Sequence, residues 1–203
     1  MRPTAALAVV FAAACAAAAP RAPKAVLTDI ASAVPGVRLD IRYATKDNFT
    51  HAVVYPAARC LLRPEASAAL AKVQAELAAG GFGLKVWDCY RPLSVQRRFW
   101  ELVPDPRYVA DPKKGSRHNR GAAVDLTLVD AAGRELEMPT GYDDFSEAAH
   151  RASTAGSPAA RANAARLEAA MARHGFKGLA TEWWHFDFDG WQAFPLLDVP
   201  LVP

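Results

Sequence analysis

The chain has 203 residues, of which 52% are hydrophobic, so it can form one compact core but is too short for two ordinary domains. Its formal net charge is +3, part of which comes from Arg2 and other basic residues near the start, and no basic run is interleaved with aromatic residues. These features argue against nucleic acid as a partner.

The first residues predict an export signal. Arg2 is followed by an apolar, alanine-rich stretch that ends at Ala19, before a proline. A positive start, a stretch too alanine-rich to span a bilayer stably and small residues before a break are typical of a secretory signal. We therefore assign 1–22 to the signal and 27–203 to one domain, exported to the periplasm or cell envelope, with no transmembrane helix in the mature chain. Lipid attachment at Cys15 is the alternative.

The first half of the domain predicts two helices separated by a strand. Pro64 in the first turn, an apolar stripe and the pair Gly80-Gly81 predict a helix over 64–79. A strand over 82–87 and a turn follow. A second helix is expected over 93–102 with Val95, Phe99 and Leu102 facing inward, and the connector to Ser116 is expected to be a loop.

The second half predicts strands on both sides of one helix. Residues 122–129 alternate in polarity with a period of two, which is typical of a buried strand, and residues 184–188 alternate in the same way. A short strand is expected near 134–138. Ser157 and Pro158 predict the start of a helix that ends at Gly175. Together the elements indicate a single α+β domain with a central, mostly antiparallel sheet and flanking helices.

Two distant segments carry the residues of a candidate metal site. Residues 116–125 contain His118 and Asp125, and residues 182–185 read Glu-Trp-Trp-His. Two imidazoles and one carboxylate leave one position of a catalytic zinc ion open, and Glu182 is then free to act as a general base. The period-two pattern places Asp125 and His185 on strands where they can meet. The alternative for each histidine is a packed core residue.

These segments are also recognisable. The pattern S-x-H-x-x-G-x-A-x-D followed by E-W-W-H resembles the VanX-type zinc D-alanyl-D-alanine dipeptidases, within the larger D-Ala-D-Ala carboxypeptidase and Hedgehog-like metallopeptidase group. The stretches Y-A-T-K-D-N-F-T at 43–50 and W-D-C-Y-R-P at 87–92 resemble two further motifs of that family. The resemblance implies a Hedgehog/DD-peptidase-like fold and hydrolysis of D-Ala-D-Ala to two D-Ala, linked to peptidoglycan turnover or glycopeptide resistance.

The resemblance also implies roles for particular residues. It implies one Zn²⁺ per chain, bound by His118, Asp125 and His185, with Glu182 as the base. Arg91 is the residue expected to stabilise the oxyanion, and the alternative is a structural salt bridge to Asp88. The residues expected to hold the substrate ammonium are Tyr43, Ser116 and Asp143. The neighbouring Asp144 is an alternative to Asp143, and both are also typical turn or cap residues.

Several alternatives concern specificity and redox state. A D,D- or L,D-carboxypeptidase that trims peptidoglycan stem peptides would use the same zinc chemistry, and a non-catalytic, zinc-stabilised cell-wall binding module would need neither Glu182 nor Arg91. The expected partners are therefore a small D,D-dipeptide or peptidoglycan fragments. The connector between Leu102 and Ser116 is short, which favours a less closed pocket.

Cys60 and Cys89 form a candidate disulfide, and two separate buried thiols are the alternative.

Overall fold

A five-stranded sheet forms the centre of the computed structural model, which describes residues 26–202; the predicted signal and Cys15 lie outside the described residues. The strand order is β2-β4-β5-β7-β6, and only the β2–β4 pair is parallel. This sheet confirms the predicted α+β class. The strands are β2 (Arg38–Leu39), β4 (Phe82–Asp88), β5 (Ala123–Asp130), β6 (Phe176–Leu179) and β7 (Glu182–Phe188).

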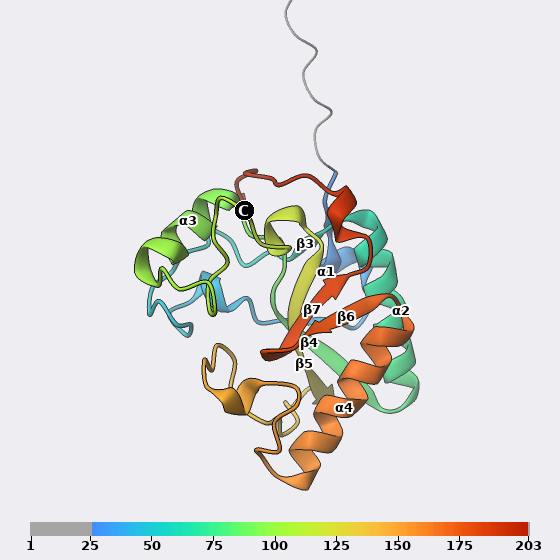
Figure 1. The fold of residues 1–203 in the computed structure, drawn as a ribbon. Helices are drawn as coiled ribbons and strands as arrows, with labels where there is room; N and C mark the ends of the chain where they lie inside the picture. The colour runs from blue at the N-terminus through green and yellow to red at the C-terminus, as the bar shows by residue number, and fades with distance from the viewer. Residues whose placement is uncertain (1–25, 203) are drawn as a thin grey trace, which may run out of the picture.

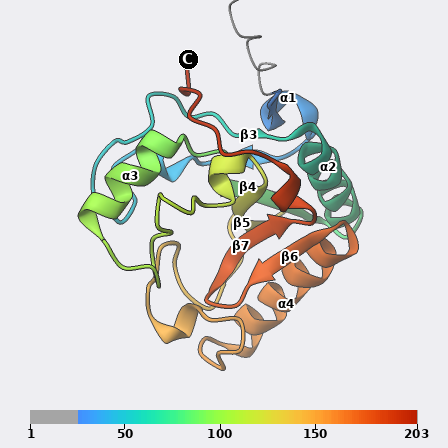
Figure 2. The same cartoon turned by 45° about the horizontal axis from the view of Figure 1, so that its top comes forward.

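Three longer helices flank the sheet at the positions that the sequence predicts. The helices α2 (Pro64–Ala79) and α3 (Leu93–Leu102) have the expected bounds, and α4 (Pro158–Arg173) begins after Ser157, whose hydroxyl accepts a hydrogen bond from a backbone N–H of its first turn. In Figures 1 and 2, α2 and α4 lie along one side of the sheet and α3 lies on the other. Within 26–202 no helix is both long and apolar enough to cross a membrane.

Short elements connect these parts. A two-stranded sheet pairs β1 (Thr28–Asp29) with β3 (Leu61–Leu62), and one turn of helix, α1 (Ile30–Ala33), follows β1. The described part of the chain also contains the short 3₁₀ helices η1 (Arg42–Ala44), η2 (His118–Arg120), η3 (Glu147–Ala149) and η4 (Trp191–Ala193). Two of them, η2 and η3, contribute His118 and Glu147 to the cavity described below.

Two sequence predictions about local structure are wrong. The segment 134–138 forms no strand and makes a single bridge, between Glu135 and Val129. The Asp130 carboxylate accepts hydrogen bonds from the backbone N–H groups of Ala132 and Arg134. The N–H of Arg134 is therefore not free to pair with β5 and extend the bridge into a strand. Leu102 does not face inward but is 55% exposed, because α3 ends there.

A disulfide links Cys60 to Cys89, with the two Cα atoms 5.2 Å apart and 29 residues of separation along the chain. It ties the segment before α2 to the end of β4. Because a cross-link restricts the unfolded chain, replacing both cysteines with alanine should lower the free energy of unfolding by about 3 kcal/mol. Urea unfolding of both proteins measures this, with wild-type protein in reductant as the control. Equal midpoints would contradict a stabilising bridge.

Candidate active site

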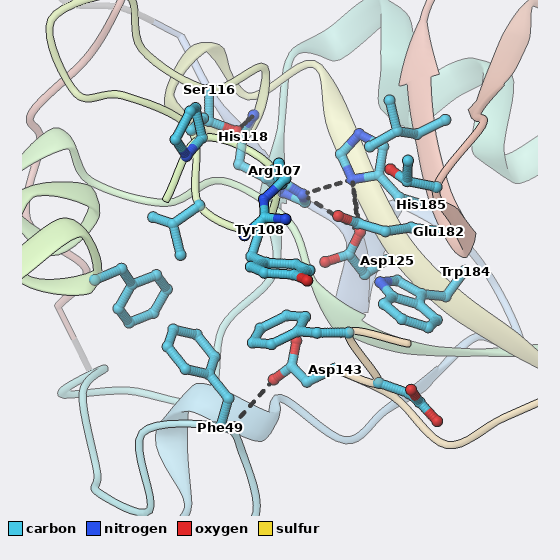
Figure 3. A pocket seen from close by; sticks show the side chains of 18 of the residues that line it. Phe49, Arg107, Tyr108, Ser116, His118, Asp125, Asp143, Glu182, Trp184 and His185 are labelled. Carbon is cyan, nitrogen blue, oxygen red and sulfur yellow. Dashed lines mark hydrogen bonds and ion pairs between the residues drawn. The ribbon is translucent and has the colours of Figure 1, made fainter. Parts of the chain in front are cut away.

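The antiparallel pairing of β5 with β7 brings two of the predicted ligands together. Asp125 and His185 are direct partners in the register, and Asp125 Oδ1 lies 2.9 Å from His185 Nδ1. His118 comes from η2, just before β5, and its Nε2 lies 3.1 Å from His185 Nδ1 and 3.3 Å from Asp125 Oδ1. All three side chains are buried. Three ligand atoms from two distant segments therefore converge on one point (Figure 3).

The donor set and its surroundings fit a zinc ion. His118 Nδ1 donates to the carbonyl oxygen of Cys89 at 2.6 Å, so the lone pair of His118 is on Nε2, which faces the other two ligands. Two imidazole nitrogens and one carboxylate oxygen at this spacing are the ligand set of a catalytic zinc site with an open position. Within 26–202 these residues form the one cluster able to hold a metal ion.

The electrostatics of the cluster also favour a bound cation. Burial alone raises the pKa of Asp125, but His118 and His185 outweigh that effect, and the pKa lies well below the usual range of a carboxyl group. Asp125 is therefore a carboxylate. Its other oxygen, Oδ2, accepts a hydrogen bond from the hydroxyl of Tyr142 at 3.0 Å, which holds the carboxylate in place.

Glu182 lies at the start of β7, beside the ligands but apart from them. Its Oε2 is 3.9 Å from His185 Nδ1, and its side chain is 21% exposed and lines the cavity. Burial raises the pKa of Glu182 above the usual range. A carboxylate whose pKa is raised towards neutral is better suited to accept and return a proton near neutral pH.

Arg91 lines the cavity, and hydrogen bonds hold its guanidinium in one orientation. Its Nε and Nη2 atoms donate to Asp88 Oδ2 at 3.2 and 2.6 Å, and Nη1 donates to Gln96 Oε1 at 2.9 Å. Asp88 is fully buried and also accepts from the hydroxyl of Tyr55 at 2.7 Å. The salt bridge to Asp88, given above as the alternative role of Arg91, is present. These bonds use only part of the donor capacity of the guanidinium, so Arg91 can still donate into the cavity that it lines.

Asp143 and Tyr43 meet at the cavity wall opposite the metal ligands. The hydroxyl of Tyr43 donates to Asp143 Oδ1 at 3.1 Å, and the backbone N–H of Phe49 donates to Oδ2 at 3.3 Å. Asp143 adopts a left-handed backbone conformation with φ 57°, and it lines the cavity. Burial and, to a smaller extent, Asp125 raise the pKa of Asp143 to about 7. A bound ammonium group would stabilise the charged carboxylate of Asp143 and so offset the effect of burial.

The two other predicted contacts have local partners. Asp144 also borders the cavity, but its Oδ1 accepts from the backbone N–H of Ser146 at 2.8 Å, the bond of a turn residue. Ser116 is buried and lines the cavity, and its hydroxyl accepts from the backbone N–H of His118 at 3.2 Å. Geometry therefore favours Asp143 over Asp144 as the residue that faces a ligand.

The cavity has a volume of about 500 Å³, and some of the residues that line it were not predicted from the sequence. Tyr108, from the connector after α3, stacks on Phe145 with ring centroids 4.9 Å apart. Trp184 from β7 also lines the cavity, as does His150. Tyr108 and His150 belong to no local motif, and the E-W-W-H motif that contains Trp184 does not by itself show that this side chain borders the cavity. The remaining lining residues from the connector are Pro106, Arg107, Val109 and Ala110.

Comparisons with known proteins identify the family to which this chain is similar. The family model described as "D-ala-D-ala dipeptidase" matches residues 24–196. A D-alanyl-D-alanine dipeptidase of Escherichia coli (strain K12) is 41% identical over 84% of this chain and 89% of its own length. A protein of the same name from Enterococcus faecium is 33% identical over 75% of this chain and 86% of its own. The zinc-bound D,D-pentapeptidase VanY is 18% identical, with a TM-score of 0.41 over 68% of this chain and 79% of that chain.

Proposed function

The chain belongs to the D-Ala-D-Ala dipeptidase family, and on this premise we propose that it hydrolyses the free dipeptide D-Ala-D-Ala to two molecules of D-Ala. The observation that carries the proposal is the convergence of His118, Asp125 and His185, with Glu182 beside them and Asp143 across the cavity. This arrangement supplies a metal centre, a base and a counter-charge for an ammonium group in one cavity of about 500 Å³.

The residues divide the reaction between them. His118, Asp125 and His185 would hold Zn²⁺, which acidifies a water molecule and polarises the peptide carbonyl when bound. Glu182 takes a proton from the attacking water and gives it to the leaving amine. Arg91, held by Asp88, donates to the oxygen on which negative charge develops. Asp143 and Tyr43 hold the substrate ammonium, and Ser116 lies on the same cavity wall as His118.

The test of the function uses three substrates and measures released D-Ala for each. Purified residues 27–203 would be loaded with zinc and incubated with D-Ala-D-Ala, N-acetyl-D-Ala-D-Ala and a stem pentapeptide. Cleavage of the free dipeptide alone, lost with a chelator and restored by zinc, is the expected result. Cleavage of the acylated substrates would instead support the carboxypeptidase, and no cleavage with zinc bound would support the binding module.

The role of Asp143 leads to a prediction about substrate charge. Asp143→Asn keeps one acceptor oxygen, for either Tyr43 or Phe49, but removes the negative charge, so kcat/KM for D-Ala-D-Ala should fall by about 10- to 100-fold, mainly through KM. Asp144→Asn is the matched control, because it removes the same charge one residue away, and it should leave KM nearly unchanged. If the two variants behave alike, Asp143 does not bind the ammonium.

The same assignment predicts the acid side of the pH profile. A carboxyl group is charged only above its pKa, which burial raises to about 7 for Asp143 in the free protein. Since kcat/KM reports ionisations of the free enzyme, it should fall for D-Ala-D-Ala as the pH drops below about 7. In Asp143→Asn, which has no carboxyl group at this position, kcat/KM should no longer fall with an apparent pKa near 7.

We also propose that the protein acts outside the cytoplasm, with 1–22 as a cleaved signal and one catalytic domain over 27–203. The Cys60–Cys89 disulfide supports this, because disulfides persist mainly in oxidising compartments. In that case the substrate pool is dipeptide released from the cell wall. Fractionation of cells and N-terminal sequencing of the mature protein test the proposal, and an intact signal on cytoplasmic protein would contradict it.

A further inference from the structure

Asp187 contacts the metal-ligand cluster from outside. It follows His185 by two positions on β7, and its Oδ1 lies 2.9 Å from His185 Nε2. A carboxylate can only accept, so Nε2 carries a proton that it donates to Asp187, while Nδ1 faces the Asp125 carboxylate at 2.9 Å, where a bound cation would take the place of a proton. The other ring nitrogen, Nδ1, is the one that faces Asp125 and His118.

Asp187 also forms an ion pair with a residue from the other ligand-bearing segment. Arg117 Nε lies 3.4 Å from Asp187 Oδ2, and Arg117 directly precedes His118. The guanidinium of Arg117 also lies over the ring of Trp191, 4.8 Å from its centroid. Arg117 therefore places a positive charge beside the Asp187 carboxylate, whose side chain is only 13% exposed.

The two histidines of the cluster are thus oriented by different outer partners. The carbonyl oxygen of Cys89 holds His118 with Nε2 facing inward, and Asp187 holds His185 with Nδ1 facing inward. If His185 carried its proton on Nδ1 instead, that nitrogen would have no lone pair to offer a metal. Hydrogen-bond acceptors on the outer nitrogen of a metal-binding histidine fix its tautomer and typically contribute 10- to 100-fold to metal affinity.

We propose that Asp187, in an ion pair with Arg117, is a positioning residue that fixes the tautomer and ring orientation of His185 for metal binding. The inference rests on the proposed function, since it takes His118, Asp125 and His185 as zinc ligands. Asp187 does not border the cavity, so it acts through His185 rather than on the substrate. Its contribution is then to metal affinity.

The experiment measures the zinc dissociation constant directly, by competition with a chromophoric chelator, for wild type, Asp187→Ala and Asp187→Asn. Asp187→Ala should bind zinc about 10- to 100-fold more weakly. Asp187→Asn keeps nearly the same shape and should lose less, because its amide oxygen still accepts from Nε2. Asp189→Asn, two residues further along the chain at an exposed position, is the matched control and should bind zinc like wild type.

Thermal unfolding of the zinc-free proteins separates positioning from a structural role. A structural role alone would lower the Tm of zinc-free Asp187→Ala while leaving the zinc dissociation constant unchanged, and this result would overturn the inference. If Asp187→Ala does not fold, an unchanged constant in Asp187→Asn together with an unchanged constant in Arg117→Ala overturns it. Failure of the wild type to bind zinc would overturn the proposed metal site as well, so the two failures are distinct.

Discussion

Glu182→Gln should reduce kcat for D-Ala-D-Ala on the order of 10³-fold while zinc stays bound, because general acid–base catalysis contributes about 10²- to 10⁴-fold. Glutamine has nearly the shape of glutamate but cannot take a proton from water at neutral pH. Glu182 lies beside the cluster, 3.9 Å from His185 Nδ1, rather than among the three converging atoms. The loss should therefore appear in kcat and not in metal content.

The measurement combines initial rates of D-Ala release with metal analysis of the purified variant. Burial raises the pKa of Glu182, which means that the charged carboxylate is less stable in the folded protein than in the unfolded chain. The neutral side chain of Glu182→Gln removes this cost, so the Tm should not fall. Glu147→Gln is the matched control, because Glu147 lines the same cavity and is exposed. A rate within a few-fold of wild type for Glu182→Gln would assign the base to another residue.

Local signals in the sequence predict the helices and the two strands that carry the ligands. Pro64 and Gly80 mark the ends of α2, and Ser157 caps α4, because caps and end residues act within one turn of helix. The period-two pattern of 122–129 and 184–188 places Asp125 and His185 on strands, and the structure pairs them in register. The local pattern alone therefore predicts the two strands, whereas their pairing joins residues 60 positions apart and depends on tertiary structure.

The parts that were not predicted depend on contacts between distant segments. The strand β6 contains Lys177 and Gly178, so it lacks the alternation that marks a half-buried strand, and β1, β2 and β3 have only two residues each. Asp187 is a polar residue of an alternating strand, and the sequence does not show that it hydrogen-bonds His185. The long-range approach of Tyr43 to Asp143, 100 residues away, depends in the same way on tertiary packing.

Arg91→Ala should lower kcat on the order of 100-fold or more with zinc still bound, because one preorganised donor to a developing oxyanion is worth about that much. The substitution also leaves Asp88 as a buried carboxylate without its cation. Breaking such a pair typically costs about 3–5 kcal/mol of stability, so a lower rate could come from a smaller folded fraction. The experiment must separate these two effects.

Two further variants make that separation. Arg91→Lys keeps a positive charge near Asp88 but loses the planar fork, so it should recover much of the stability and little of the rate. Arg63→Ala removes another buried arginine, which donates to the backbone carbonyl of Arg120 at 2.7 Å and does not line the cavity. Its folded fraction should retain the wild-type kcat.

Rates must therefore be divided by the folded, zinc-bound fraction of each variant, obtained from unfolding curves and metal analysis. Added guanidinium should restore part of the activity of Arg91→Ala, since the deleted side chain leaves space beside Asp88 for the same cation, and it should not help Arg63→Ala. If Arg91→Ala keeps the wild-type kcat after this correction, Arg91 serves only as the partner of Asp88. In that case the oxyanion must be stabilised by the metal centre and the other cavity residues alone.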